Sequence, residues 1–74
     1  MEKVTPRMRL AAVIRARRTE LKYSQDTFAD VIDMHRAYYA SIERGERNVT
    51  IETLIRVATG LRVDVATLAR KANI

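Results

Sequence analysis

The segment MHRAYYASIERG, residues 34–45, concentrates side chains that are able to do chemistry. It holds the only histidine of the chain, His35, followed by Arg36 and by two adjacent tyrosines. His35 is a candidate metal ligand or general base, but the chain has no cysteine and no carboxylate cluster surrounds His35, so we expect no metal site. Ser24, Ser41 and Thr50 lack the histidine–carboxylate arrangement that activates a nucleophile. The sequence therefore does not predict an enzyme.

The two tyrosines of this segment must have different surroundings. Neighbouring residues on a helix point about 100° apart, so Tyr38 and Tyr39 cannot share one environment. We expect one ring in a core and the other at a surface.

The composition predicts one small globular domain. Of the 74 residues, 47% are hydrophobic, which is enough for a folded core. The absence of cysteine excludes disulfides and thiolate metal sites and fits a reducing cytosol, so we expect a cytoplasmic protein. The longest strictly apolar run, LAAVI at residues 10–14, is too short to cross a membrane.

The charge favours an anionic partner. Fourteen Lys and Arg against nine Asp and Glu give a net charge of +5, which suits nucleic acid, although an anionic membrane surface also fits. Seven of the cationic residues lie within the first 22 positions. The alternative for any one of them is a place on a solvated helix face.

Caps and periodicity predict five helices and no strands. The signals are a capping residue before each run of helically spaced apolar residues and Gly45 after the third. The expected helices run from Pro6 to about residue 22, from residue 25 to about 32, from about 36 to 44, from 51 to 61 and from 65 to 72. Ile51, Leu54 and Ile55 belong to the expected apolar face of the fourth helix. The second and third helices, joined by a turn of about three residues, have the dimensions of a helix-turn-helix.

Most of the sequence resembles a known family. The stretch from Leu10 to Leu61 is similar to the Cro and phage-repressor type of helix-turn-helix regulators, also called XRE-like. The most specific pieces are SQ at residues 24–25, IERG at 42–45, and RN at 47–48 followed by TIETL. Within that family, HRAYYASIERGERN is most similar to the controller proteins of restriction–modification systems, which are short, basic, five-helix dimers. The implied fold is a compact all-α bundle of the lambda-repressor-like type.

The resemblance also implies a role for individual residues. The start of the third helix would read base edges in the major groove, where the bidentate fork of Arg36 suits guanine. An ion pair between Arg18 and Glu43 would be structural. Lys22 and Asp33 stand where the family often has glycine, and Arg17 where it often has leucine. The implied base-reading residues are His35, Arg36, Ala37 and Ser41, and the implied DNA-backbone contacts are Gln25, Tyr38, Arg47 and Asn48.

Two of these side chains have a structural alternative. His35 would cap the third helix and touch DNA, or only cap it. The resemblance places Tyr39 in the core and Tyr38 toward the DNA backbone or solvent, where its ring would otherwise only cover neighbouring side chains.

The last helix is the expected dimer interface. We treat residues 1–74 as a single DNA-binding domain, with residues 1–5 flexible and 64–74 as the dimerisation helix. Its stripe consists of Val65, Leu68, Ala69 and Ala72, and the alternative is that these residues are plain core. A symmetric dimer would place two recognition helices on paired half-sites.

These expectations combine into one hypothesis with two rivals. The chain would be a homodimeric transcription regulator that binds a pseudo-palindromic operator in double-stranded DNA and blocks or recruits RNA polymerase, as repressor or activator. The rivals are an antitoxin that binds an operator and a toxin, and a protein-interaction module that keeps the fold. No cofactor, small-molecule ligand or membrane partner is expected.

Overall fold

The protein, described by a computed structural model over residues 3–74, consists of five helices, and no strand occurs in that range. This confirms the predicted all-α class and the predicted order of elements. The expected flexible leader, residues 1–5, lies partly outside the described residues, and Thr5 caps the first helix. The helices are α1 (Pro6–Glu20), α2 (Gln25–Val31), α3 (Arg36–Glu43), α4 (Ile51–Gly60) and α5 (Val65–Lys71).

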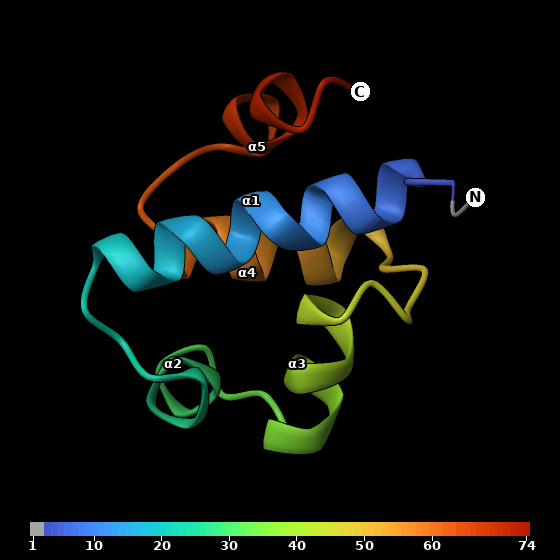
Figure 1. Ribbon diagram of the computed structural model, residues 1–74. Helices are drawn as coiled ribbons and strands as arrows, with labels where there is room; N and C mark the ends of the chain where they lie inside the picture. Colours follow the sequence, from blue (N-terminus) through green and yellow to red (C-terminus); the bar gives the residue numbers. More distant parts are fainter. Residues whose placement is uncertain (1–2) are drawn as a thin grey trace.

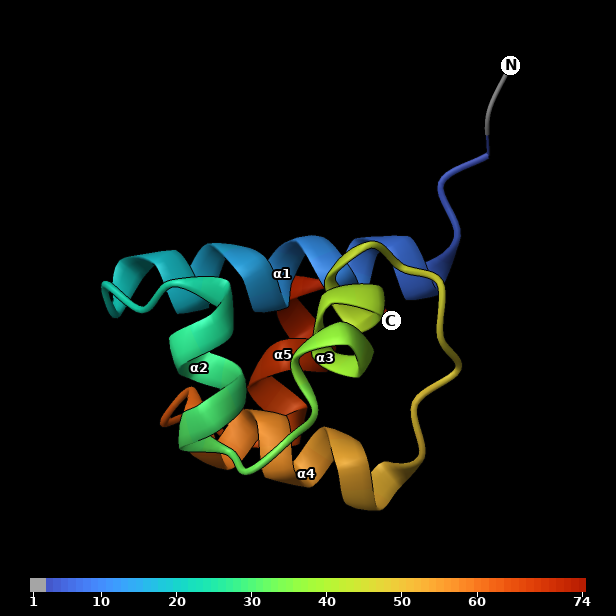
Figure 2. The ribbon, with the colours of Figure 1, turned by 90° about the horizontal axis from the view of Figure 1, so that it is seen from below.

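The helices pack around α1, which is the longest of them. Figure 1 shows α2 and α3 on one side of α1, α5 on the opposite side and α4 behind it. Contacts join α2 to α3, α1 to both α3 and α5, and α4 to α5. Figure 2 shows α3 lying between α2 and the long connection that leads into α4. The pair α2–α3 therefore forms an outer layer of the molecule.

Capping side chains start four of the five helices as predicted. Each accepts a hydrogen bond from the backbone N–H three residues later, which satisfies a donor that the helix itself cannot pair. The capping residues are Thr5, Ser24, Thr50 and Asp64. His35 occupies the corresponding position of α3, but its side chain makes no capping hydrogen bond. The expectation that His35 caps α3 is therefore confirmed for its position at the start of the helix, but its side chain adds no hydrogen bond there.

All five helices end in the same way, with one residue in the left-handed region. In each case the following N–H bonds back five residues, as in Tyr23 to Arg18 and Glu46 to Ser41. Only one of the five residues is glycine, so the other four adopt positive φ at a steric cost. The five are Lys22, Asp33, Gly45, Arg62 and Asn73. The left-handed turn expected at Asp33 is present, and Lys22 accepts the same geometry without glycine.

The core lies where all five helices meet. The fully buried rings of Phe28 and Tyr39 lie in it with their centroids 5.2 Å apart, and the half-buried ring of Tyr23 packs against Phe28 at 5.7 Å. Full burial of side chains of this size stabilises the fold by about 1.5–3 kcal/mol each. The largest fully buried side chains are Tyr39, Phe28, Ile14, Leu61, Leu68 and Val57. Tyr39 therefore faces the core, as the family resemblance implied.

The prediction that the stripe on the last helix forms the dimer interface needs correction. Leu68 is 1% exposed and Ala72 2% exposed in the single chain, because α5 packs these residues against α1. They complete the core and are not available to a second copy. Val65 and Ala69 are only half-buried, but without Leu68 the stripe is no continuous exposed face.

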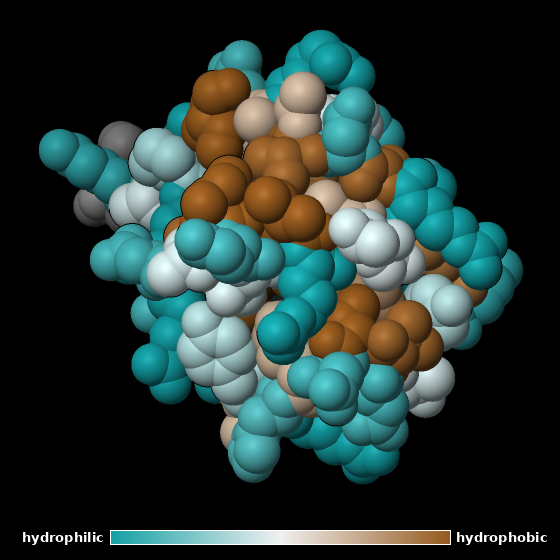
Figure 3. Space-filling model, turned by 180° about the vertical axis from the view of Figure 1, so that it is seen from behind, coloured by the Kyte–Doolittle hydropathy of each residue, from teal (hydrophilic) through white to brown (hydrophobic). Residues whose placement is uncertain are grey.

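The apolar face expected for α4 is also partly wrong. Ile51 is 57% exposed and Ile55 50% exposed, whereas Val57, Ala58 and Leu61 are buried. The helix is hydrophobic over more of its circumference than its neighbours cover. Figure 3 shows hydrophobic surface gathered on the side of the molecule where α4 lies in front.

Several arginines of α1 serve the fold itself. Arg9 Nε donates to the carbonyl of Ala72 at 2.9 Å, and Arg17 Nε donates to the carbonyl of Leu61 at 3.0 Å. These carbonyls end α5 and α4, where a positive charge also suits the helix dipole. The cationic cluster in the first 22 residues is thus partly structural. Among residues 3–74, every helix is too short or too polar to cross a membrane.

Candidate nucleic-acid interface

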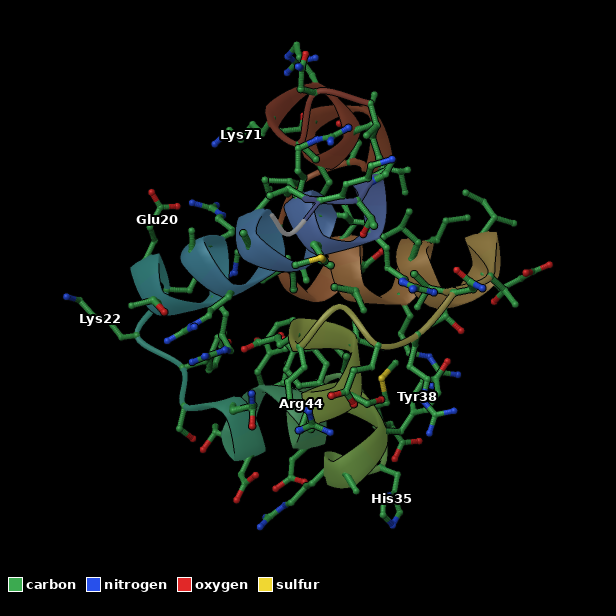
Figure 4. The ribbon with its side chains drawn as sticks, turned by 45° about the vertical axis from the view of Figure 1, so that its right-hand side comes forward. Glu20, Lys22, His35, Tyr38, Arg44 and Lys71 are labelled. Atoms are coloured by element: carbon green, nitrogen blue, oxygen red, sulfur yellow. The ribbon has the colours of Figure 1, made fainter. Side chains whose placement is uncertain are left out.

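The first turn of α3 is presented to solvent. Tyr39, one turn further along α3, is fully buried, whereas the residues of the first turn are not covered by the rest of the protein. His35, Arg36 and Ala37 are all exposed, and Figure 4 shows His35 projecting from the end of α3 away from the other helices. Three of the four residues expected to read bases therefore lie together on one accessible surface.

Ser41, the fourth expected base-reading residue, is not on that surface. Its side chain is 4% exposed, and its hydroxyl donates to the backbone carbonyl of Tyr38 at 2.6 Å. The same oxygen accepts a hydrogen bond from Arg47 Nε at 3.0 Å. Ser41 is one turn too far into the packed part of α3 to reach a base edge. It holds Arg47 instead.

Tyr38 and Arg47 form one unit at the edge of α3. The guanidinium carbon of Arg47 lies 5.3 Å from the centroid of the Tyr38 ring, which is a cation–π geometry. The ring is half-buried against the core, so it is fixed on one side and covered by Arg47 on the other. This unit orders a cation beside the first turn of α3, and both of its residues are DNA-backbone contacts that the resemblance implied.

Arg7 joins this edge from the far end of the sequence. Its Nη1 donates to Asn48 Oδ1 at 2.9 Å, and both residues are exposed. Asn48 is an expected backbone contact, whereas Arg7 was not singled out from the sequence. The two residues are 41 positions apart, so no local spacing pattern could have indicated the pair.

Arg36 is held by two carboxylates of α2. Arg36 Nε and Nη2 donate to the two oxygens of Asp30 at 3.3 Å and 2.7 Å, and Nη1 approaches Asp26 at 3.5 Å. The hydrogen bonds with Asp30 raise the pKa of Arg36 and lower the pKa of Asp30. The sequence analysis did not anticipate these partners, because the turn between α2 and α3 brings them together.

A buried ion pair between Arg18 of α1 and Glu43 of α3 stabilises the packing of α2 and α3 against α1. Arg18 Nε and Nη2 donate to the carboxylate of Glu43 at 2.6 Å and 3.0 Å, and the Glu43 side chain is 2% exposed. Gln25 Nε2 donates to the same carboxylate at 3.1 Å, and the Tyr39 hydroxyl donates to it as well. Glu43 therefore connects α1, α2 and α3, and the pairing that the resemblance implied is present.

The hydrogen bonds to Glu43 keep its side chain ionised. Burial raises the pKa of Glu43, but the hydrogen bonds from Arg18, Tyr39 and Gln25 outweigh burial and leave that pKa below its usual range. Burial, followed by the contact with Glu43, raises the pKa of Tyr39. The centre of the network is a carboxylate at neutral pH, and Gln25, an expected phosphate contact, is oriented by it.

The exposed part of this surface has a composition suited to a polyanion. Cations and hydrogen-bond donors line one side of the molecule, carried by α3, by its connection to α4 and by the start of α1. Such groups pair with phosphates and base edges. The residues are Arg7, His35, Arg36, Tyr38, Arg47 and Asn48.

Comparison with known proteins places this surface in context. A sequence family described as helix-turn-helix matches residues 14–68. Control protein C.MunI from a Mycoplasma species is 42% identical over 55 residues, which cover 74% of this chain and 72% of that protein. Control protein C.SmaI from Serratia marcescens is 38% identical over 65 residues, which cover 88% of this chain and 77% of that protein.

The fold is similar to that of solved controller proteins. The restriction–modification controller protein C.Esp1396I, solved as a tetramer in complex with its natural 35 base-pair operator, aligns with a TM-score of 0.81 and 26% sequence identity. The alignment covers 97% of this chain and all of that chain.

Proposed function

The chain belongs to the helix-turn-helix family and is a relative of control proteins, and we propose that it is a sequence-specific transcription regulator that binds a pseudo-palindromic DNA operator as a homodimer. The finer proposal is that it controls a restriction–modification system, which is the role stated in the name of the structurally similar controller protein C.Esp1396I. Repression or activation would follow from where the operator lies relative to the promoter.

One observation carries this proposal: the first turn of α3 is exposed and aligned with an ordered cationic edge. In the proposed complex this turn enters the major groove, where Arg36 donates to O6 and N7 of a guanine and His35 and Ala37 meet adjacent bases. Tyr38 and Arg47 lie beside it at the DNA backbone. Gln25 and Asn48 also contact phosphates, with Arg7 close to Asn48.

A dimer is needed because one recognition helix reads only a few base pairs. The face that we propose for it is the start of α4, where Ile51 and Ile55 lie one turn apart and are both at least half exposed. Exposed apolar groups of this kind mark protein interfaces. Since α3 lies beside the connection into α4 (Figure 2), a two-fold axis there brings two α3 helices side by side, facing the same way. This face replaces the terminal stripe.

Selection of bound sequences from a random duplex pool tests DNA recognition and symmetry together. We expect a pseudo-palindromic consensus whose half-sites are about 34 Å apart, one turn of DNA. Affinity for it should fall steeply with salt, because phosphate contacts release counterions. Bound duplexes that share no consensus sequence, or an affinity that does not change with salt, would contradict the proposal.

A matched pair of substitutions tests the dimer face. Ile55→Glu places a charge in the proposed interface, whereas Val31→Glu changes an equally exposed residue of α2. By sedimentation at micromolar concentration, Ile55→Glu should be a folded monomer and Val31→Glu should remain a dimer. If Ile55→Glu stays dimeric, the interface lies elsewhere.

A further inference from the structure

The contact between Arg36 and Asp30 uses only one edge of the guanidinium group. An arginine can pair bidentately through its Nε–Nη2 edge or through its Nη1–Nη2 end. Asp30 accepts from Nε and Nη2, at 3.3 Å and 2.7 Å. Nη2 uses one of its two N–H groups in this pair, and Nη1 makes one longer contact, 3.5 Å to Asp26, so each of the two end nitrogens has a further N–H. The arrangement therefore fixes the plane of the guanidinium while leaving its Nη1–Nη2 end available.

We propose that Asp30 is a specificity-determining positioning residue, which holds Arg36 by its side edge so that the end of the guanidinium is presented to a guanine. This inference rests on the proposed function, and it adds a residue of α2 that would itself touch no base. It predicts that Asp30 matters for discrimination between DNA sequences more than for affinity.

Asp30 has two physical effects, and only one of them bears on specificity. An arginine side chain loses rotamer freedom when it pairs with a base, and a side chain already held by Asp30 loses less. The Asp30 carboxylate also repels phosphates, which lowers the affinity for operator and scrambled duplexes alike. Specificity is the difference between the two binding free energies, so the positioning increases it and the repulsion leaves it unchanged.

Asp26 provides a matched control on the same helix. It lies one turn before Asp30, carries the same charge and is similarly exposed, at 64% against 58% for the side chains. Its only contact with Arg36 is the single one at 3.5 Å. Asp26→Asn and Asp30→Asn therefore change the field at the DNA surface similarly, while only Asp30→Asn removes the bidentate partner.

The experiment measures the ratio of affinities for the selected operator and a scrambled duplex at one salt concentration. Asp30→Asn should bind the scrambled duplex more tightly and lose about fivefold in the ratio, a coupling typical of residues in contact. Asp26→Asn should raise both affinities together and leave the ratio within roughly twofold, because it changes only the long-range field. In an Arg36→Ala background, Asp30→Asn should no longer change the ratio.

Nuclear magnetic resonance of the Arg36 Nε–H group tests the positioning without DNA. This group should be ordered in the parent protein and more mobile in Asp30→Asn, with Asp26→Asn resembling the parent. Equal mobility in all three proteins would overturn the inference.

The DNA-binding measurements separate a failure of the inference about Asp30 from a failure of the proposed function. An unchanged or increased ratio in Asp30→Asn would make Asp30 a bystander or a competitor for Arg36, and equal effects of the two substitutions would reduce the contact to bulk charge. An unchanged ratio, an increased ratio or equal effects of the two substitutions would each overturn the inference about Asp30 and leave the proposed function intact. A parent protein that does not distinguish operator from scrambled duplex would contradict the proposed function itself.

Discussion

Replacement of Glu43 by glutamine removes the one negative charge on which α1, α2 and α3 converge. The glutamine has the same shape, so no cavity forms. It leaves Arg18 buried beside a neutral amide, and its new NH2 group faces the donors of Arg18 and Gln25, which had shared the carboxylate. The contact of Arg18 Nη1 with the carbonyl of Tyr23, at 2.8 Å, is retained.

The cost follows from burial. Removal of one partner from a buried ion pair destabilises a protein by about 3–5 kcal/mol. Here Glu43 is 2% exposed but Arg18 is 13% exposed and keeps the Tyr23 bond, so we expect a value near the lower limit, about 3 kcal/mol. A domain of this size has a free energy of unfolding of roughly 4–11 kcal/mol. The substitution should therefore remove a large share of the stability.

Urea and thermal unfolding followed by circular dichroism measure this loss. The melting temperature of Glu43→Gln should fall by roughly 12 °C or more, because 1 kcal/mol shifts it by about 4–8 °C in a domain this small. Glu46→Gln is the control, since Glu46 pairs with Arg44 at the surface and surface pairs contribute little. A loss below about 1 kcal/mol in Glu43→Gln would refute the argument that this pair is buried and uncompensated.

The same substitution should change the response to acid. The pKa of Glu43 is lower in the folded chain than in the unfolded one, so its contribution is present above the unfolded value, about 4.3, and is lost as the pH falls below it. The parent should lose stability on acidification below about pH 4, and Glu43→Gln should lose less over the same range. Parallel curves for the two proteins would mean that Glu43 does not titrate as argued.

Three further predictions concern single side chains. Gln25→Ala should weaken binding to operator and scrambled duplexes by similar factors, since phosphate contacts carry no sequence information; a loss confined to the operator in a titration would contradict this. Ser41→Ala should also weaken both duplexes, by about threefold, because Arg47 loses its fixed position, and unchanged affinity would show that Ser41 has no such role. Lys22→Gly should raise the melting temperature, because positive φ costs a non-glycine residue about 1 kcal/mol; a lower midpoint would mean that the Lys22 side chain stabilises the fold.

The elements of this fold were predictable because their signals are local. A capping oxygen such as that of Ser24 acts on an N–H three residues away, and a helix end such as that at Gly45 is decided within one turn. The different surroundings of Tyr39, which is fully buried, and Tyr38, which is half-buried, follow from helix geometry together with the family resemblance. The same resemblance implied the pairing of Arg18 with Glu43, 25 positions apart, which local spacing could not have indicated.

The partners of these elements were not predictable in the same way. Leu68 and Ile55 are equally good apolar residues in the sequence, yet α5 buries Leu68 against α1 while Ile55 stays half exposed. Ser41 was expected at a base edge because it matches a base-reading position of the family, but that part of α3 packs inward.

The sequence by itself determined five helices, four of their capping side chains, a net positive charge and the resemblance to a family. Only the tertiary structure decided which faces are covered, which arginines cap other helices and which carboxylates hold Arg36. The physical reason is the separation along the chain of the residues that interact. Backbone hydrogen bonds and caps depend on residues within one turn, whereas burial and pairing depend on how whole helices cross, and contacts such as Asp30–Arg36 exist only after the turn between α2 and α3 has closed.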